Sequence, residues 1–159
     1  MAVVPEKFSV NEESTILFLM HGYGSHMGDL ASLSGLIQNG SHLMICPNAP
    51  LSLQLGVNQT GFSWGNYEDQ ENYTNDINVS SERAFATIDS AKSQYGFDDS
   101  NLIIGGFSQG GSMALRMGFT KNRKFKGVMA LSTILREDHQ AYIQRSDIPI
   151  FVSHGTNDQ

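Results

Sequence analysis

The chain has 159 residues, of which 40% are hydrophobic, and its net charge at pH 7 is −6. This length is sufficient for one domain with a substantial core and short for two, so we expect a single domain over residues 1–159. The acidic balance and the scattered Lys and Arg exclude the basic surface that binding to nucleic acid requires. No apolar run is long enough to span a membrane and no signal-peptide pattern opens the chain, so the sequence predicts a cytoplasmic protein.

Short apolar runs alternate with helical patterns along the chain. Runs typical of buried strands occupy residues 14–20, 42–47, 101–106, 125–132 and 148–154. Helical spacing of apolar residues occupies 28–40, 81–95 and 109–118. Residues 47–77 read as a long polar loop, and residues 133–147 are ambiguous. The alternation predicts an α/β fold with a mostly parallel sheet and helices on both faces, in which ligands bind beyond the carboxyl ends of the strands.

Residues 106–110 read Gly-Phe-Ser-Gln-Gly and fit the pattern G-x-S-x-G. The pattern directly follows a predicted strand and directly opens a predicted helix. Small neighbours let a strand and a helix pass closely around a strained serine, and the helix N-terminus favours developing negative charge. This context favours Ser108 as a nucleophile over the alternative, a serine that only caps the helix.

A second glycine-rich segment, His-Gly-Tyr-Gly-Ser at residues 21–25, follows the first predicted strand. In folds with a serine on such a turn, one oxyanion donor is the N–H after the nucleophile and the other comes from this position. The sequence therefore predicts the backbone N–H groups of Tyr23 and Gln109 as donors. His21 precedes the nucleophile, so we expect it to brace the turn and not to act as a base.

Asp158 follows the last predicted strand. The carboxyl ends of parallel strands share one edge of a sheet, so this position favours a catalytic acid over an ordinary turn residue. His154, which precedes the acid, is expected to be structural.

Several segments together resemble the carboxylesterase/phospholipase family that includes the acyl-protein thioesterases. They are, in chain order, FLMHGYGS, PNAP, FSW, LIIGGFSQGGSMAL, MALS and HGTND. The resemblance implies a three-layer α/β-hydrolase fold, a Ser-Asp-His triad and hydrolysis of small-molecule carboxylic esters or thioesters without a cofactor or metal. It implies Ser108 as nucleophile, Asp158 as acid, and Tyr23 and Gln109 as oxyanion donors.

The chain departs from the family pattern at Tyr23, at Ser25, at residues 65–66 and at Thr133. In the family these positions surround the acyl and leaving-group pockets. The resemblance therefore makes Trp64 and Thr133 candidates for the substrate pocket.

In this fold the triad histidine follows the aspartate, and no histidine follows Asp158. We therefore expect an incomplete α/β-hydrolase domain that lacks the last strand and helix, with impaired hydrolysis unless another base, such as His139, replaces it. The alternative is a catalytically silent binding or assembly module. In either case, without the last strand of the fold, residues Ile148–Val152 would form an exposed sheet edge, which predicts a homo-oligomer. A flavodoxin-like nucleotide binder is disfavoured because the spacing G-x-G-x-x-G is missing.

Overall fold

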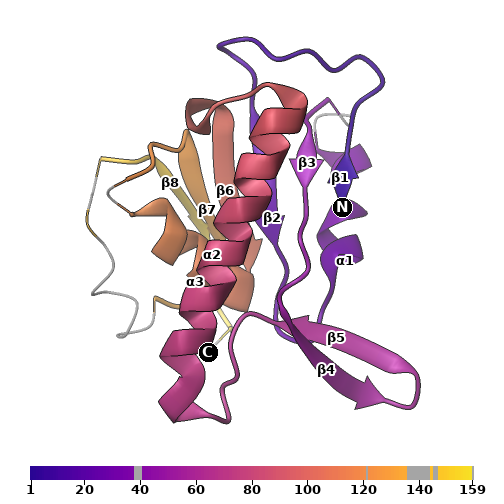
Figure 1. Cartoon of the computed structure of the whole chain (residues 1–159), viewed down its shortest axis with the longest axis vertical. Helices are drawn as coiled ribbons and strands as arrows, with labels where there is room; N and C mark the ends of the chain where they lie inside the picture. Colours follow the sequence, from indigo (N-terminus) through magenta and orange to yellow (C-terminus); the bar gives the residue numbers. More distant parts are fainter. Residues whose placement is uncertain (38–40, 121, 136–143, 145–146, 159) are drawn as a thin grey trace.

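A computed structural model describes residues 1–37, 41–120, 122–135, 144 and 147–158. Its main sheet has the strand order β1-β3-β2-β6-β7-β8, and every neighbouring pair is parallel except β1 with β3 (Figure 1). The strands are β1 (Ala2–Val3), β2 (Ile16–Met20), β3 (Met44–Ile45), β6 (Leu102–Phe107), β7 (Gly127–Leu131) and β8 (Ile150–Ser153). The five predicted strands are confirmed, and β1 is an addition that sequence analysis missed.

The helices are α1 (Met27–Ala31), α2 (Gln70–Tyr95) and α3 (Gln109–Gly118), with 3-10 turns η1 (Ser34–Leu36) and η3 (Asp99–Asn101). The helix expected over 28–40 is therefore shorter, and residues 38–40 lie outside the described residues. The helix predicted at 109–118 is confirmed. No helix within the described residues combines the length and apolar character that a membrane span requires.

The long loop predicted over 47–77 is wrong. Residues 51–63 form an antiparallel hairpin of β4 (Leu51–Gly56) and β5 (Gln59–Ser63), which projects from one end of the sheet (Figure 1). Asn58 adopts a φ of 61° in its turn, a left-handed conformation that asparagine tolerates. Helix α2 already begins at Gln70, after the Asp69 side chain accepts a hydrogen bond from the Asn72 N–H.

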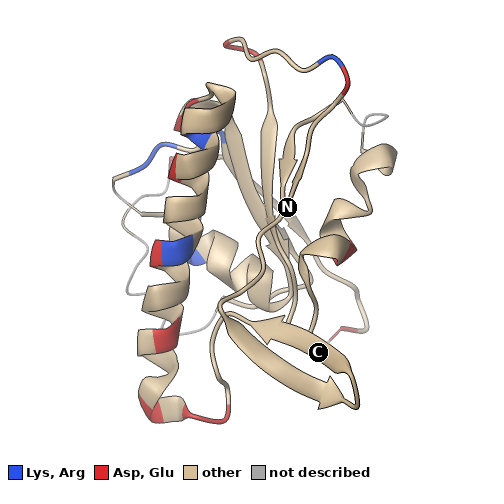
Figure 2. Ribbon diagram, turned by 45° about the vertical axis from the view of Figure 1, so that its right-hand side comes forward, with Lys and Arg blue, Asp and Glu red and all other residues tan. Residues whose placement is uncertain are grey.

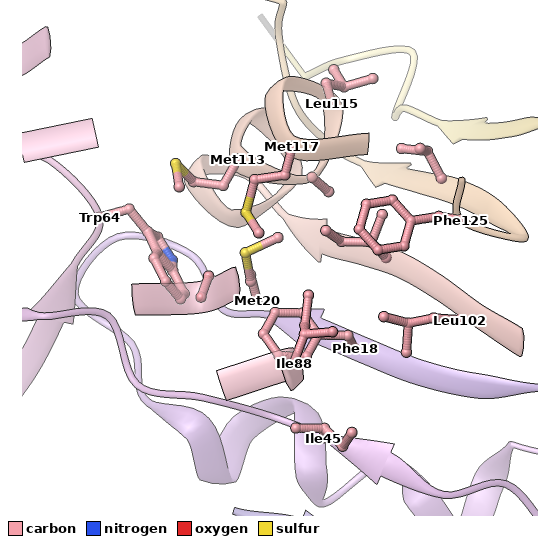
Figure 3. Packing of buried hydrophobic residues seen from close by; sticks show 14 of the residues in the cluster. Phe18, Met20, Ile45, Trp64, Ile88, Leu102, Met113, Leu115, Met117 and Phe125 are labelled. Atoms are coloured by element: carbon pink, nitrogen blue, oxygen red, sulfur yellow. The ribbon is translucent and has the colours of Figure 1, made fainter. Parts of the chain in front are cut away.

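The side chains of the sheet alternate between two apolar layers. Helices α2 and α3 pack on one face, against alternate residues of the central strands such as Phe18, Met20 and Leu102 (Figure 3). On the other face, Leu17, Leu19 and Met44 pack beneath α1 and the turn after it. The three layers of an α/β-hydrolase fold follow from this arrangement.

Strand β8 forms one edge of the described sheet and is exposed along its length. Phe151 is 60% exposed and Val152 is 62% exposed, although both are apolar. Ile148 is only 6% exposed, so the edge expected over Ile148–Val152 begins later, at Ile150.

An ion cluster fastens the end of α2 to the segment before β7. The Asp99 carboxylate accepts hydrogen bonds from the Arg123 guanidinium at 2.6 and 2.8 Å and from Lys92 Nζ at 3.0 Å. Burial alone would raise the pKa of Asp99, but the hydrogen bonds from Arg123 and Lys92 outweigh it, so the pKa lies below its ordinary value. The guanidinium also lies over the Phe85 and Phe125 rings.

Replacement of Asp99 with Asn should lower the free energy of unfolding at pH 7 by about 1.5–3 kcal/mol, because the charge-assisted hydrogen bonds are lost. A lowered folded-state pKa contributes stability above the unfolded-state value of about 3.9 and loses it as the pH falls through the folded-state value. Urea unfolding at pH 7 and near pH 3 should therefore show a difference between wild type and Asp99→Asn that shrinks in acid. Glu82→Gln, on the exposed side of α2, should change neither measurement; an equal difference at both pH values would contradict the assignment.

Candidate active site

Ser108 lies at the junction of β6 and α3 with a φ of 53° and a ψ of −118°. Such a positive φ is uncommon for a residue with a side chain and persists only where the surroundings enforce it. Here the Ser108 N–H donates to the Leu131 carbonyl at 2.9 Å, and the Ser108 carbonyl accepts from the Thr133 hydroxyl at 2.6 Å. The strand–turn–helix context predicted for the G-x-S-x-G segment is confirmed.

The helix after Ser108 starts in direct contact with the end of β2. A Cβ atom placed on Gly110 would lie 2.1 Å from the Met20 carbonyl oxygen. A Cβ atom on Gly106 would lie 2.3 Å from the Gly110 carbonyl carbon. No side chain fits at either position, so both glycines are needed for α3 to begin where it does.

Residues 21–25 pass beside the serine. We call them the oxyanion loop, because the sequence predicts that one oxyanion donor comes from this segment. A Cβ atom on Gly22 would lie 3.5 Å from Ser108 Cβ. Gln109 is the first residue of α3, so its N–H has no partner within the helix. Among the residues that the structure describes, neither the Tyr23 N–H nor the Gln109 N–H donates a hydrogen bond. Both amides therefore remain candidates for the oxyanion donors that the sequence predicts.

The hairpin strand β5 holds the oxyanion loop in place. The Gly24 N–H donates to the Phe62 carbonyl and the Phe62 N–H donates to the Ser25 carbonyl, both at 2.9 Å. The two backbones are so close that a Cβ atom on Gly61 would lie 2.1 Å from the Gly24 carbonyl oxygen. The hairpin, which the sequence did not predict, is thus part of the site's framework.

His21 has the bracing position expected from the sequence. Its Nδ1 lies 2.8 Å from the Gly22 carbonyl, and its Nε2 accepts from the Ala49 N–H at 3.0 Å. The acceptor role of Nε2 requires a neutral imidazole with the proton on Nδ1. Burial, the largest effect, lowers the pKa of His21 and favours that neutral form. Both nitrogens are occupied, which leaves this histidine unsuited to proton transfer.

The Gln109 side chain has a role that sequence analysis missed. It is buried, with Oε1 accepting from the Trp64 N–H at 3.0 Å and from the Ser63 hydroxyl at 3.1 Å. Its Nε2 donates to the Gly65 carbonyl at 3.0 Å. Gln109, whose backbone N–H is a predicted oxyanion donor, is therefore anchored through its side chain to the end of β5 and the residues after it. No local sequence pattern announces this, because the partners lie more than forty positions away.

The two residues expected in the substrate pocket make other contacts in the structure. Trp64 is 1% exposed, packs in the main core and donates through Nε1 to the His21 carbonyl (Figure 3). Thr133 braces the turn of Ser108: its hydroxyl donates to the Ser108 carbonyl and lies 2.9 Å from the Ser112 hydroxyl. Within the described part of the chain, neither residue lines the cavity beside Ser108. The assignment of both residues to a substrate pocket rests on the family resemblance and stays a prediction.

A cavity of about 360 Å³ opens beside the half-buried Ser108. Its walls come from the oxyanion loop, from α1 and from the end of β6. Residues that line it include Tyr23, Asp29, Leu30, Phe107 and Ser108. We call it the Ser108 cavity below. It is the space in which a group bound to the serine would lie.

Asp158 leaves the same edge of the sheet as Ser108. Phe107, Leu131 and Ser153 pair in register across β6, β7 and β8, so the carboxyl ends of the outer two strands are roughly 10 Å apart. Asp158 lies in the turn after β8, where its Oδ2 is 3.7 Å from His154 Nε2. The structure places the serine and the acid on one rim, with β7 between them.

None of the described histidines hydrogen-bonds to the Ser108 hydroxyl. His26 caps α1 through Nδ1, and His42 contacts the Thr15 carbonyl, which precedes β2 at the opposite end of the sheet. His139 lies outside the described residues.

In the described part of the chain, no three His, Cys, Asp or Glu residues come together as metal ligands would.

The chain is similar to known proteins along its whole length. The phospholipase/carboxylesterase family profile matches residues 3–159. Acyl-protein thioesterase 1 of Cryptococcus neoformans is 33% identical over 122 residues, which is 70% of this chain and 50% of that protein. Acyl-protein thioesterase 1 of Emericella nidulans is 27% identical over 175 residues, or 94% of this chain and 72% of that protein. The match thus spans half of the first relative and more of the second.

Solved structures show the same fold. Esterase PE8 is 27% identical with a TM-score of 0.68, over 89% of this chain and 68% of that one. SOBER1 of Arabidopsis thaliana is 19% identical with a TM-score of 0.71, over 91% of this chain and 75% of that one. With the family profile matched from residue 3 to residue 159, the chain belongs to the phospholipase/carboxylesterase family of α/β-hydrolases.

Proposed function

We propose that this chain is a serine hydrolase of small-molecule carboxylic esters or thioesters, with Ser108 as the nucleophile. The observation that carries the proposal is the strained turn that holds Ser108 beside two free amides, those of Tyr23 and Gln109. Strain of this kind concentrates at functional sites. The names of the relatives, acyl-protein thioesterase and esterase, support the same class of reaction.

The chemistry follows from the positions of these groups. The Ser108 oxygen attacks the carbonyl carbon and forms a tetrahedral intermediate, whose negative oxygen accepts hydrogen bonds from the two amides. Collapse of the intermediate breaks the ester bond: the proton taken from Ser108 passes to the leaving group, which departs as an alcohol or thiol, and the acyl group stays on Ser108. Water then attacks the acyl carbon and gives up a proton, the bond between that carbon and the Ser108 oxygen breaks, and the oxygen takes the proton as the carboxylic acid product leaves.

We further propose that Asp158 orients the group that accepts the Ser108 proton. No described histidine reaches the serine. The proton acceptor is therefore either a group outside the described residues or a water molecule. In a serine protease with a Ser-His-Asp triad, loss of the histidine lowers kcat by about 10⁶. The oxyanion hole and substrate binding still accelerate the reaction by about 10³ to 10⁴ over the uncatalysed rate. The same observation supports a second candidate, a catalytically silent module that binds or assembles through its fold.

Hydrolysis of p-nitrophenyl butyrate and labelling by a fluorophosphonate probe separate these two candidates. If a proton acceptor serves Ser108, wild type should hydrolyse the ester and be labelled, and Ser108→Ala should lose both because the attacking oxygen is gone. Ser93→Ala, on the exposed side of α2, should behave like wild type. Labelling that persists in Ser108→Ala would contradict the assignment of the nucleophile. A folded wild type with neither activity would favour the silent module.

Gly61→Ala should disturb the oxyanion loop without touching Ser108, because the new methyl group would meet the Gly24 carbonyl. The labelling rate should fall by at least about tenfold, which corresponds to weakening one oxyanion donor, and the melting temperature should drop. Gly56→Ala is the matched control in the same hairpin, since the nearest atom to its Cβ would be 3.8 Å away. Equal labelling rates in the two variants would show that the hairpin does not position the donors.

We also propose that β8 pairs with β8 of a second copy across a two-fold axis, because its apolar edge is exposed. Light scattering at micromolar concentration should give a dimer or larger assembly for wild type. Val152→Lys places a charge on that edge and should give a monomer. Val57→Lys, at the 96% exposed position of the hairpin turn, makes the same change elsewhere and should leave the assembly intact. A monomeric wild type would refute the pairing.

A further inference from the structure

The Ser108 cavity is lined by two aromatic residues and a carboxylate. Tyr23 and Phe107 line it and are 48% and 47% exposed, and the Tyr23 ring also lies 5.7 Å from the Tyr67 ring, tilted by 45°. Asp29, from the first turn of α1, lines the same cavity. None of the lining residues is Lys or Arg. A space lined by aromatic residues and a carboxylate is suited to a positive group, since aromatic rings and negative charges both attract cations.

The Asp29 carboxylate is ionised and only partly engaged. It accepts a hydrogen bond from the Ser25 hydroxyl, which is the main reason that its pKa lies below the ordinary value. Its second oxygen lies 3.6 Å from His26 Nε2, and 53% of the Asp29 side chain is accessible. The contact with Ser25 and its place in α1 give Asp29 a local structural role. They do not cover the carboxylate, so its charge still acts on the cavity.

The neighbouring hairpin adds no charge of either sign to this part of the molecule. Residues 51–65, which form the hairpin and the segment after it, contain no Lys, Arg, Asp or Glu. Figure 2 shows the hairpin entirely uncharged, with an acidic position on α1 and Lys and Arg placed on other elements. Among the lining residues of the Ser108 cavity, Asp29 is therefore the one carboxylate and no Lys or Arg opposes it, in a chain whose net charge is −6.

We propose that the Ser108 cavity selects esters or thioesters whose leaving group carries an ammonium ion a few bonds from the scissile carbonyl. The ammonium would lie against the Tyr23 and Phe107 rings and toward Asp29. This inference rests on the proposed hydrolase function and specifies its substrate class: cationic leaving groups are favoured over neutral groups of equal size, and anionic ones are disfavoured.

The test compares butyrylthiocholine with its uncharged isostere, S-(3,3-dimethylbutyl) thiobutyrate. Wild type should show the higher kcat/KM for the thiocholine ester. Asp29→Asn should reduce the ratio of the two kcat/KM values by about twofold to fivefold, the range for loss of a partly exposed ion pair. Asparagine keeps an acceptor for the Ser25 hydroxyl, and a thermal melt checks that the variant is folded.

Glu82→Gln provides the matched control, because it makes the same change of net charge on the exposed side of α2. Its ratio should equal that of wild type. A ratio that is the same in wild type and Asp29→Asn overturns the inference, while hydrolysis that depends on Ser108 would leave the proposed function standing. A fall in Glu82→Gln as large as in Asp29→Asn also overturns it, since the effect would then reflect net charge alone.

A binding measurement keeps the inference testable if neither ester is hydrolysed. Tetramethylammonium chloride, titrated into Ser108→Ala at constant ionic strength, should shift the amide resonances of residues 22–30. Asp29→Asn in the same background should weaken that binding by a similar factor, and the neutral analogue tert-butanol should shift these resonances less. Absence of a shift in this segment, or equal shifts with both compounds, overturns the proposal.

Discussion

The contact between Gly110 and the Met20 carbonyl is the constraint on which the site depends. It brings the start of α3 against the end of β2, so the loop that leaves β2 passes directly beside Ser108. The crossing leaves Ser108 in a positive-φ conformation, which costs about 1–3 kcal/mol. Hydrogen bonds to the Ser108 backbone from β7 and Thr133 offset this strain, at about 1 kcal/mol each. The same few contacts therefore stabilise the fold and set the geometry of the site.

Strand β7 connects the end of β6, where Ser108 lies, with the end of β8, which Asp158 follows. The Leu131 carbonyl accepts from the Ser108 N–H, and one residue later the Ser132 N–H donates to the Ser153 carbonyl at 2.7 Å. Ser132 also has a positive φ, of 42°. The carboxyl ends of three neighbouring strands are therefore fixed at one level by backbone hydrogen bonds. The relative position of Ser108 and Asp158 follows from this register more than from any contact between their side chains.

Sequence reasoning succeeded where one chemical signal decides the structure. The central strands are continuous apolar runs, and Gly106 and Gly110 around Ser108 admit few alternatives to a strand–turn–helix. It failed for the hairpin even though Leu51, Leu53, Leu55 and Val57 alternate with polar or small residues, as in a strand. The Pro- and Asn-rich surroundings favoured a loop, and most of residues 52–60 are exposed, so no buried run marked the strands. The directions of side chains also had no signal in the sequence: Trp64 packs into the core, and the Thr133 hydroxyl donates to the Ser108 carbonyl. The partners of the Gln109 side chain are long-range and have no local signature.

The Asp29 carboxylate opposes one step of the proposed reaction. A negative charge in the same cavity opposes the build-up of charge on the oxyanion, by an amount of about 1 kcal/mol at 4 Å in water and more where water is excluded. The free amides of Tyr23 and Gln109 compensate part of this repulsion for every substrate. A substrate with its own positive charge removes the remainder, because its ammonium interacts favourably with both the carboxylate and the developing oxyanion. The same residue can therefore slow the reaction of neutral esters and leave cationic ones unimpeded, so specificity would arise from repulsion as much as from attraction.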